Sequence, residues 1–161
     1  MSDKIQKITS FLWFDNNAEE AVNFYTSIFK NSKILQTARY GKNMPGKEGA
    51  IMTIKFLLDG QEFLALNGGP IFKFTEAISL LVNCNSQEEI DELWKKLVAD
   101  GGEESQCGWL KDKFGLSWQI VPADIANMIS DANPQKSQRV MEEVMKMIKL
   151  DINILRKAYA E

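Results

Sequence analysis

Residues 18–29 read AEEAVNFYTSIF and residues 87–98 read QEEIDELWKKLV, and the two stretches align without a gap. Each follows a short apolar run, FLWF at 11–14 or LLV at 80–82, and each precedes further strand-like runs. An internal repeat of this kind indicates tandem copies of one supersecondary unit. We therefore predict two similar modules, with a binding site between the copies.

Both repeated segments have the pattern of amphipathic helices. Asn17 with Glu20, and Ser86 with Glu89, form capping-box pairs at the two starts. The apolar residues that follow recur at the i, i+3, i+4 and i+7 spacing of one helical face. They are Ala21, Phe24, Tyr25 and Ile28 in the first copy, and Ile90, Leu93, Trp94 and Leu97 in the second.

Strand-like segments surround each predicted helix. In the first half they are residues 5–14, 33–40, 50–58 and 61–67, with a two-residue hairpin turn predicted at Asp59 and Gly60. In the second half they are residues 78–83, 106–111 and 116–121, with a turn at 113–115. Each half therefore reads βαβββ, the second in abbreviated form, and the fold class is α+β.

The segment after Pro122 is predicted to be helical. Asn133 followed by Pro134 resembles a helix start, and Asp151 is a candidate cap for a last helix. Val140, Met141, Val144, Met145 and Ile148 form an apolar stripe that is either core or a subunit contact. We expect a domain at 1–123, made of modules 4–69 and 76–122, and a helical extension at 124–161.

Composition excludes several classes of protein. The 161 residues are 45% hydrophobic and 25% charged, with a net charge of −3, which is typical of a folded domain and argues against a nucleic-acid partner. No segment resembles a signal peptide or a membrane span. Two cysteines are too few for a disulfide framework, so we expect reduced thiols in a cytoplasmic protein.

Three motifs resemble a known family. They are FLWFD at 11–15 with AEEA at 18–21, ALNGGP at 65–70, and CGWLKDKFGLSWQIVP at 107–122. With the tandem modules, they resemble the PhnB-like proteins of the vicinal-oxygen-chelate superfamily, which includes glyoxalases, bleomycin-resistance proteins and dioxygenases. PhnB-like proteins are often described as demethylubiquinone methyltransferase-like. The resemblance implies a glyoxalase-like fold in which two curved sheets form a cup.

The resemblance also identifies the positions that hold a metal in related enzymes. They fall on Ser10, on Ser79 or Ala77 depending on the alignment, on Gln119, and on Leu64, with Leu66 and Asn67 close by. The chain contains no histidine. Because Zn, Ni, Fe and Mn prefer imidazole and carboxylate ligands, we predict neither a metal nor another cofactor.

Strand alternation predicts which residues line the cup. Ser10, Leu12 and Phe14 are assigned to the cup face, with Phe11 and Trp13 beneath the helices; Ser117 and Gln119 face the cup, with Trp118 and Ile120 on the helix side. The predicted lining comprises Ser10, Leu12, Phe14, Leu64, Asn67, Ser79, Lys111, Ser117 and Gln119. Such a mainly apolar surface favours a small apolar or amphipathic ligand. The alternative is that these polar groups bond to one another and partly fill the cup.

Candidates for catalysis are few. Cys107 is the only attractive nucleophile, but without histidine its activation would depend on Lys111 or Lys113, so a bystander thiol is favoured. No glycine-rich loop joins a strand to a helix, as a methyl-donor site in a doubly wound fold would require. Metal-free binding, a metal-dependent enzyme, a resistance protein that sequesters a toxic molecule, and a dimerisation scaffold all remain open. We expect a homodimer.

Overall fold

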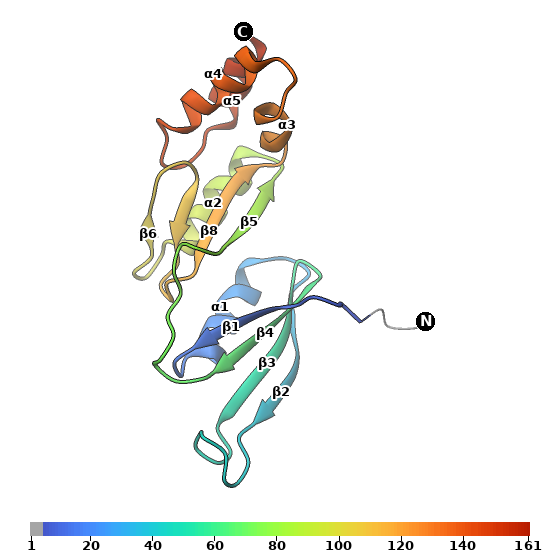
Figure 1. The fold of residues 1–161 in the computed structure, drawn as a ribbon, viewed down its shortest axis with the longest axis vertical. Helices are drawn as coiled ribbons and strands as arrows, with labels where there is room; N and C mark the ends of the chain where they lie inside the picture. The colour runs from blue at the N-terminus through green and yellow to red at the C-terminus, as the bar shows by residue number, and fades with distance from the viewer. Residues whose placement is uncertain (1–4) are drawn as a thin grey trace. The chain divides into compact units, whose positions relative to one another are not determined.

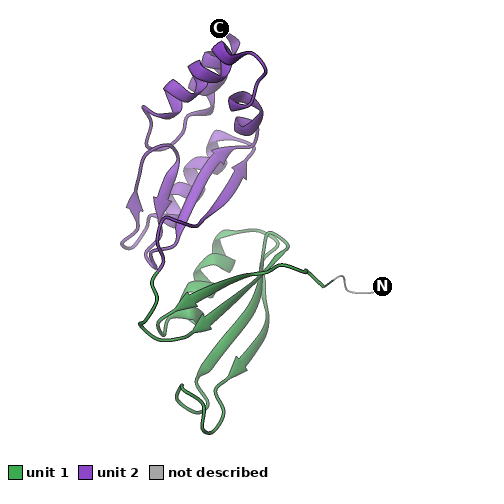
Figure 2. Ribbon diagram, viewed as in Figure 1, with its two compact units in different colours: residues 1–73 green, residues 74–161 purple. Residues whose placement is uncertain are grey.

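The chain folds as two compact units, Met1–Lys73 and Phe74–Glu161 (Figure 2). This description rests on a computed structural model that describes residues 5–161, so the predicted first residue of module 4–69 lies outside it. Each unit contains a four-stranded sheet with one helix packed on it (Figure 1). The prediction of tandem βαβββ modules followed by C-terminal helices is confirmed.

The first unit is built around the sheet β1-β4-β3-β2. Strand β1 pairs in parallel with β4, and the other neighbours are antiparallel. The turn between β3 and β4 is the predicted hairpin, since Asp59 and Gly60 both have positive φ, at 46° and 79°. The elements are β1 Ser10–Phe14, α1 Ala18–Ile28, β2 Lys33–Arg39, β3 Ile51–Leu58 and β4 Gln61–Asn67.

The second unit repeats this topology in the sheet β5-β8-β7-β6. Strand β5 is parallel to β8, and the rest of the sheet is antiparallel. Three further helices complete the unit. The elements are β5 Ser79–Cys84, α2 Gln87–Leu97, β6 Glu103–Glu104, β7 Trp109–Lys111, β8 Ser117–Pro122, α3 Ile125–Ile129, α4 Pro134–Val144 and α5 Ile152–Ala160.

Each sheet buries one face beneath its helix. In the first unit α1 packs on β3 and β4, and in the second α2 packs on β8, β5 and β7. The residues at alternate positions on these faces are almost fully buried. They are Leu12, Phe14, Ile54, Phe56, Phe63 and Ala65 in the first sheet, and Leu110, Trp118 and Ile120 in the second.

The two modules differ by one residue between the first strand and the helix. Three residues separate β1 from α1, whereas two separate β5 from α2. When the two helices are aligned without a gap, the residues of β1 are therefore aligned one position out of step with those of β5. A shift of one residue along a strand places every side chain on the opposite face. The expectation that Ser10, Leu12 and Phe14 face away from the helix is wrong for this reason, and Phe11 and Trp13 occupy the other face instead.

The two helix starts are also capped differently. Ser86 accepts a hydrogen bond from the Glu89 N–H, as predicted for α2. The Asn17 side chain makes no cap bond to α1. The Ala18 N–H instead donates to Asn67 Oδ1 at 2.9 Å, so the cap comes from the end of β4.

The C-terminal helices form a small core with the end of β8. This core contains Val121, Ile125, Met128, Val140, Val144, Leu150 and Leu155. Asn133 and Asp151 cap α4 and α5 as predicted. The predicted stripe is divided, because Val140 and Val144 are buried whereas Met141, Met145 and Ile148 are exposed.

Candidate functional site on the uncovered sheet faces

We call the face of each sheet opposite its helix the uncovered face. It carries most of the polar and charged side chains of the sheets whose role the fold does not explain. In the second unit, Ser79, Ser117, Lys111 and Glu103 pair across β5-β8-β7-β6, so their side chains lie side by side on this face. We call these four residues the polar row. The predicted positions Ser79, Lys111 and Ser117 are therefore brought together by the strand register.

A second, more apolar row lies beside the polar row. Leu81, Gln119 and Trp109 pair across β5, β8 and β7. Leu81 is 50% exposed. Gln119 Nε2 donates a hydrogen bond to Ser79 Oγ at 2.9 Å, which joins the two rows. This contact supports the alternative that the polar groups bond to one another, although the Ser79 O–H and the Gln119 carbonyl can still bind another molecule.

Lys111 is held between two carboxylates. Its Nζ lies 3.1 Å from Glu103 Oε2 and 3.1 Å from Glu76 Oε1. Hydrogen bonds and charge from Glu103 and Glu76 raise the pKa of Lys111. A backbone hydrogen bond and the Lys111 ammonium lower the pKa of Glu76. The positive charge of Lys111 is thus compensated within the second unit.

Ser117 lies at the centre of the polar row. Its side chain is 1% exposed, and its Oγ has no hydrogen-bond partner among residues 5–161. A buried hydroxyl without a partner is costly, by about 1–3 kcal/mol. Ser117 is therefore a group that gains from a bound hydrogen-bonding molecule.

The uncovered face of the first unit is more apolar. Phe11 pairs with Leu64, and Trp13 pairs with Leu66, on this face. Phe11 is 52% exposed. Lys55 and Glu62 form an ion pair on the same face, with 3.0 Å between Nζ and Oε2. Leu64 lies on the face that the sequence analysis predicted, and Leu66, which was named beside it, shares that face. Phe11 and Trp13 were predicted beneath the helix and were missed; the longer β1–α1 loop is the signal that would have identified them.

Four of the predicted lining residues lie on the helix side of the first sheet. Leu12 and Phe14 are 7% and 3% exposed, and Ser10 shares their face. The Asn67 side chain stabilises the fold: its Oδ1 caps α1, and its Nδ2 donates to the Ile51 carbonyl at 3.1 Å. These residues form and fix the core of the unit, and the assignment of all four to the uncovered face is wrong.

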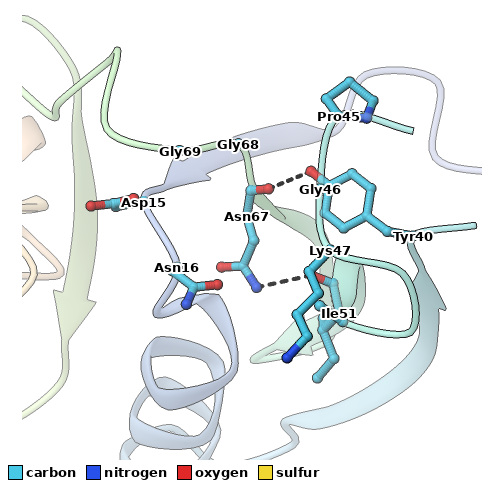
Figure 3. A pocket seen from close by; sticks show the side chains of 11 residues that line it. Asp15, Asn16, Tyr40, Pro45, Gly46, Lys47, Ile51, Asn67, Gly68 and Gly69 are labelled. Atoms are coloured by element: carbon cyan, nitrogen blue, oxygen red, sulfur yellow. Dashed lines mark hydrogen bonds between the residues drawn. The ribbon is translucent and has the colours of Figure 1, made fainter. Parts of the chain in front are cut away.

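A pocket of about 270 Å³ lies where β1 and β4 end, against the loop between β2 and β3 (Figure 3). The Tyr40 hydroxyl donates to the Asn67 carbonyl at 2.6 Å, and Gly46 lies so close to the Tyr40 ring that a Cβ there would be 2.3 Å from Cδ2. These contacts fix the loop. The lining residues are Asp15, Asn16, Tyr40, Pro45, Gly46, Lys47, Ala50, Ile51, Asn67, Gly68 and Gly69.

The charged groups of this pocket do not form a reactive set. Asp15 and Lys47 are exposed, and the volume is below the roughly 300–1,000 Å³ of ordinary ligand pockets. Gly68 beside it serves packing, because a Cβ there would lie 2.4 Å from the Trp13 ring. We therefore assign this pocket no chemistry.

The cysteines are not arranged for nucleophilic catalysis. Both are free thiols. Cys107 packs against the C-terminal core, and its backbone N–H donates to the Met147 carbonyl at 2.8 Å. Of the two candidate activators, Lys111 is paired with Glu76 and Glu103, and Lys113 Nζ lies 5.2 Å from the centre of the Phe114 ring. Burial raises the pKa of Cys84 to about 12, so this thiol stays protonated at neutral pH.

Residues 5–161 contain neither a cluster of metal-binding side chains nor a membrane-spanning helix. No group of three or more His, Cys, Asp or Glu side chains is placed to hold a metal ion in this range. None of the helices there has both the length and the apolar character needed to cross a bilayer. The absence of a bound metal remains a prediction for chemical analysis.

Comparison with known proteins identifies the family. The family model described as 3-demethylubiquinone-9 3-methyltransferase matches residues 6–121. The chain belongs to this family. A PhnB protein from Bacillus cereus is 45% identical over 73% of this chain and 100% of its own, with a TM-score of 0.67. No curated protein sequence matches the chain.

More distant structures show the fold of the PhnB-family chain. Protein PA1353 from Pseudomonas aeruginosa is 20% identical, with a TM-score of 0.57 over 70% of this chain and 94% of its own. The fosfomycin resistance protein FosX from Listeria monocytogenes is 17% identical, with a TM-score of 0.55 over 76% of this chain and 96% of its own. The chain therefore shares its fold with PA1353 and FosX.

Proposed function

We propose that this PhnB-family protein binds a small apolar or amphipathic molecule on the uncovered face of its second sheet, without a transition metal. The observation that supports the proposal most strongly is the composition of that face. Half-exposed Leu81 on β5 and Trp109 on β7 offer apolar contact on the two sides of Gln119, and Ser79, Ser117 and Gln119 offer neutral hydrogen bonds beside them. The apolar uncovered face of the first unit is a further contact surface of the same kind.

The donor groups on the second uncovered face argue against a metal. Ser79 and Gln119 supply only neutral oxygen atoms, which bind Zn, Ni, Fe or Mn poorly without an anionic ligand. The nearby carboxylates of Glu76 and Glu103 already bind the Lys111 ammonium. A FosX structure is described as complexed with Mn(II) and sulfate. We do not extend that metal to this chain, because these residues do not provide a matching ligand set.

The family description also refers to methyl transfer, which we do not propose here. The strand-to-helix junctions are Asp15-Asn16-Asn17 and Asn85-Ser86, and neither contains the glycine that lets a helix start approach a nucleotide-like donor. Gly68 and Gly69 follow a strand but lead into the linker, where Gly69 accepts a hydrogen bond from Trp13. Their role is in packing.

The free thiols Cys84 and Cys107 support a reducing location. We propose the cytoplasm as the compartment in which binding takes place.

A pair of variants tests the binding surface. Leu81→Asp places a charge on the uncovered face, and Ile154→Asp places one on α5 at similar exposure, 45% against 50%. We expect n-octanol, titrated calorimetrically, to bind the parent protein and Ile154→Asp alike, and to bind Leu81→Asp at least about tenfold more weakly. Failure of octanol to bind the parent protein, or equal loss in both variants, would contradict the proposal.

A further inference from the structure

The charges beside the proposed binding surface do not cancel. Glu76 and Glu103 flank Lys111 at 3.1 Å each, which leaves one unit of negative charge on this cluster. Glu104, the neighbour of Glu103, does not contribute to the same face, because its Oε1 accepts a hydrogen bond from Trp94 Nε1 of α2 at 2.6 Å. The ion-pair cluster of Glu76, Lys111 and Glu103 on the uncovered face of the second unit is therefore net negative.

Lys111 is poorly placed to bind an anion. Two of its three N–H donors are directed to carboxylates, and a ligand carboxylate or phosphonate would have to compete with both. Bringing another negative charge within a few ångströms of Glu76 and Glu103 is also repulsive. The cluster thus disfavours anionic groups although it contains a lysine.

Neutral hydrogen-bonding groups lie beside this charge. Ser117 Oγ is buried without a partner among residues 5–161, and it pairs in register with Ser79 on one side and Lys111 on the other. Ser79 accepts from Gln119, so its own O–H and the Gln119 carbonyl remain to complement a ligand. The unpartnered Ser117 hydroxyl is an independent indication that this end of the face receives a polar group.

We propose that the polar row selects ligands whose head group is a protonated amine, and that it discriminates against carboxylates and phosphonates. The inference rests on the proposed function, since it specifies the head group of the same amphipathic ligand. The alkyl part lies along Leu81 and Trp109, and the amine lies towards Glu103 and Ser117. An uncharged hydroxyl head group is accepted with intermediate affinity.

Three probes with the same tail test the head-group preference. We expect n-octylamine, n-octanol and n-octanoate to bind in that order of affinity at pH 7 and low salt, with at least about a tenfold difference between amine and carboxylate. The difference should shrink in 0.5 M NaCl, because salt screens exposed charges. Titration calorimetry below the aggregation limit of the probes measures all three affinities.

A matched pair of charge variants locates the preference. Glu103→Gln should reduce the ratio of amine to carboxylate affinity at least about threefold, as expected if about 0.7 kcal/mol of the discrimination comes from this carboxylate. Glu104→Gln removes the same charge one residue away, on the helix side, and should leave the ratio nearly unchanged. Equal effects of the two variants would overturn the inference, since only overall charge would then matter.

The outcomes separate this inference from the proposed function. Octanoate binding as tightly as octylamine overturns the head-group preference but leaves binding on the uncovered face intact. If none of the three probes binds, the proposed function itself fails. Octylamine affinity that is unchanged in Ser117→Ala, with Glu103→Gln behaving as expected, would show that Ser117 does not contact the head group and would contradict that part of the inference.

Discussion

Asn67 holds together three parts of the first unit. It is 9% exposed, and its amide bonds to the Ala18 N–H and to the Ile51 carbonyl, while its own backbone carbonyl accepts from Tyr40. The end of β4 thereby fixes the start of α1, the start of β3 and the loop after β2. A residue that resembles a ligand-binding amide in the sequence is structural in the folded chain.

Replacing Asn67 should therefore destabilise the protein without changing ligand affinity. Asn67→Ala removes the partner of the buried Ala18 N–H and of the part-buried Ile51 carbonyl, which costs about 1–3 kcal/mol in the free energy of unfolding. Asn17→Ala, at the helix start itself, should cost only a few tenths of a kcal/mol because its side chain makes no cap bond. Urea denaturation followed by circular dichroism compares the two, and a larger loss in Asn17→Ala would contradict this account.

Gln119 is expected to behave in the opposite way. Its amide bonds to Ser79 on the uncovered face rather than to the core. In Gln119→Leu, octanol affinity should fall by roughly 5- to 150-fold, the equivalent of about 1–3 kcal/mol for a lost buried hydrogen-bonding group. The melting temperature should change little because leucine has a similar size. Unfolding of this variant with unchanged affinity would show that Gln119 serves stability instead.

At the scale of elements, the hairpin between β7 and β8 is organised by one buried carboxylate. Asp112, 3% exposed, accepts hydrogen bonds from the Phe114 N–H at 2.8 Å, the Leu116 N–H at 3.1 Å and Trp118 Nε1 at 2.9 Å. A carboxylate with several donors is stabilised in its charged form although it is buried. This turn sets the register of β7 against β8, and hence the alignment of Lys111 with Ser117.

Removing this carboxylate should damage both stability and the binding face. Asp112→Ala leaves three donors without their acceptor, and we expect a loss of about 2–5 kcal/mol in unfolding free energy. Trp118→Tyr removes the indole donor and some buried ring volume, but it should retain the backbone bonds of the turn. Folded Asp112→Ala protein should also bind octanol more weakly than Trp118→Tyr; equal affinity and stability in the two variants would contradict the proposed role of the turn.

At the scale of the whole molecule, the exposed apolar residues in α4 and just after it are relevant to whether the protein forms a dimer. Met141, Met145 and Ile148 are 39%, 66% and 50% exposed. Met141 lies in α4, Met145 is its C-cap and Ile148 lies beyond the helix, so the predicted helical stripe ends early. These exposed apolar residues are still a candidate subunit contact, and stable interfaces usually bury over about 1,200 Å². The expectation of a homodimer therefore remains a prediction.

Light scattering tests the dimer directly. We expect a mass of about twice 18.3 kDa at micromolar concentration. Met145→Lys should shift the equilibrium towards the monomer, whereas Gln135→Lys, at an exposed polar position of the same helix, should not. A monomeric parent protein would refute the prediction, and loss of the dimer in both variants would assign the effect to charge alone.

Metal content is also a property of the whole molecule. We expect less than about 0.1 equivalent of Zn, Ni, Fe or Mn per chain, because the predicted ligand positions carry serine, leucine and glutamine. Elemental analysis of protein purified without chelator measures this. About one equivalent that disappears in Gln119→Ala, but not in Glu104→Gln, would show that a metal site exists on the uncovered face.

The sequence alone determined the features that depend on near neighbours. The Asp59-Gly60 turn, the Ser86, Asn133 and Asp151 caps, and most of the helices and strands were predicted from the residues, because these structures form within a few positions of the chain. The short strand β6 and the helix α3 were not predicted. The faces of β8 were also predicted, since Trp118 and Ile120 alternate with Ser117 and Gln119 along one strand.

Tertiary structure decided the features that depend on partners distant in sequence, or on whether a loop has an odd or an even number of residues. One extra residue between β1 and α1 exchanges the faces of Ser10, Leu12 and Phe14, which a gapless helix alignment conceals. The cap of α1 comes from Asn67, 49 positions away in sequence from the helix start. Likewise, only strand register and the segment before β5 bring Glu103 and Glu76 to Lys111. Local patterns specify elements, whereas the environment of a side chain depends on which elements pack around it.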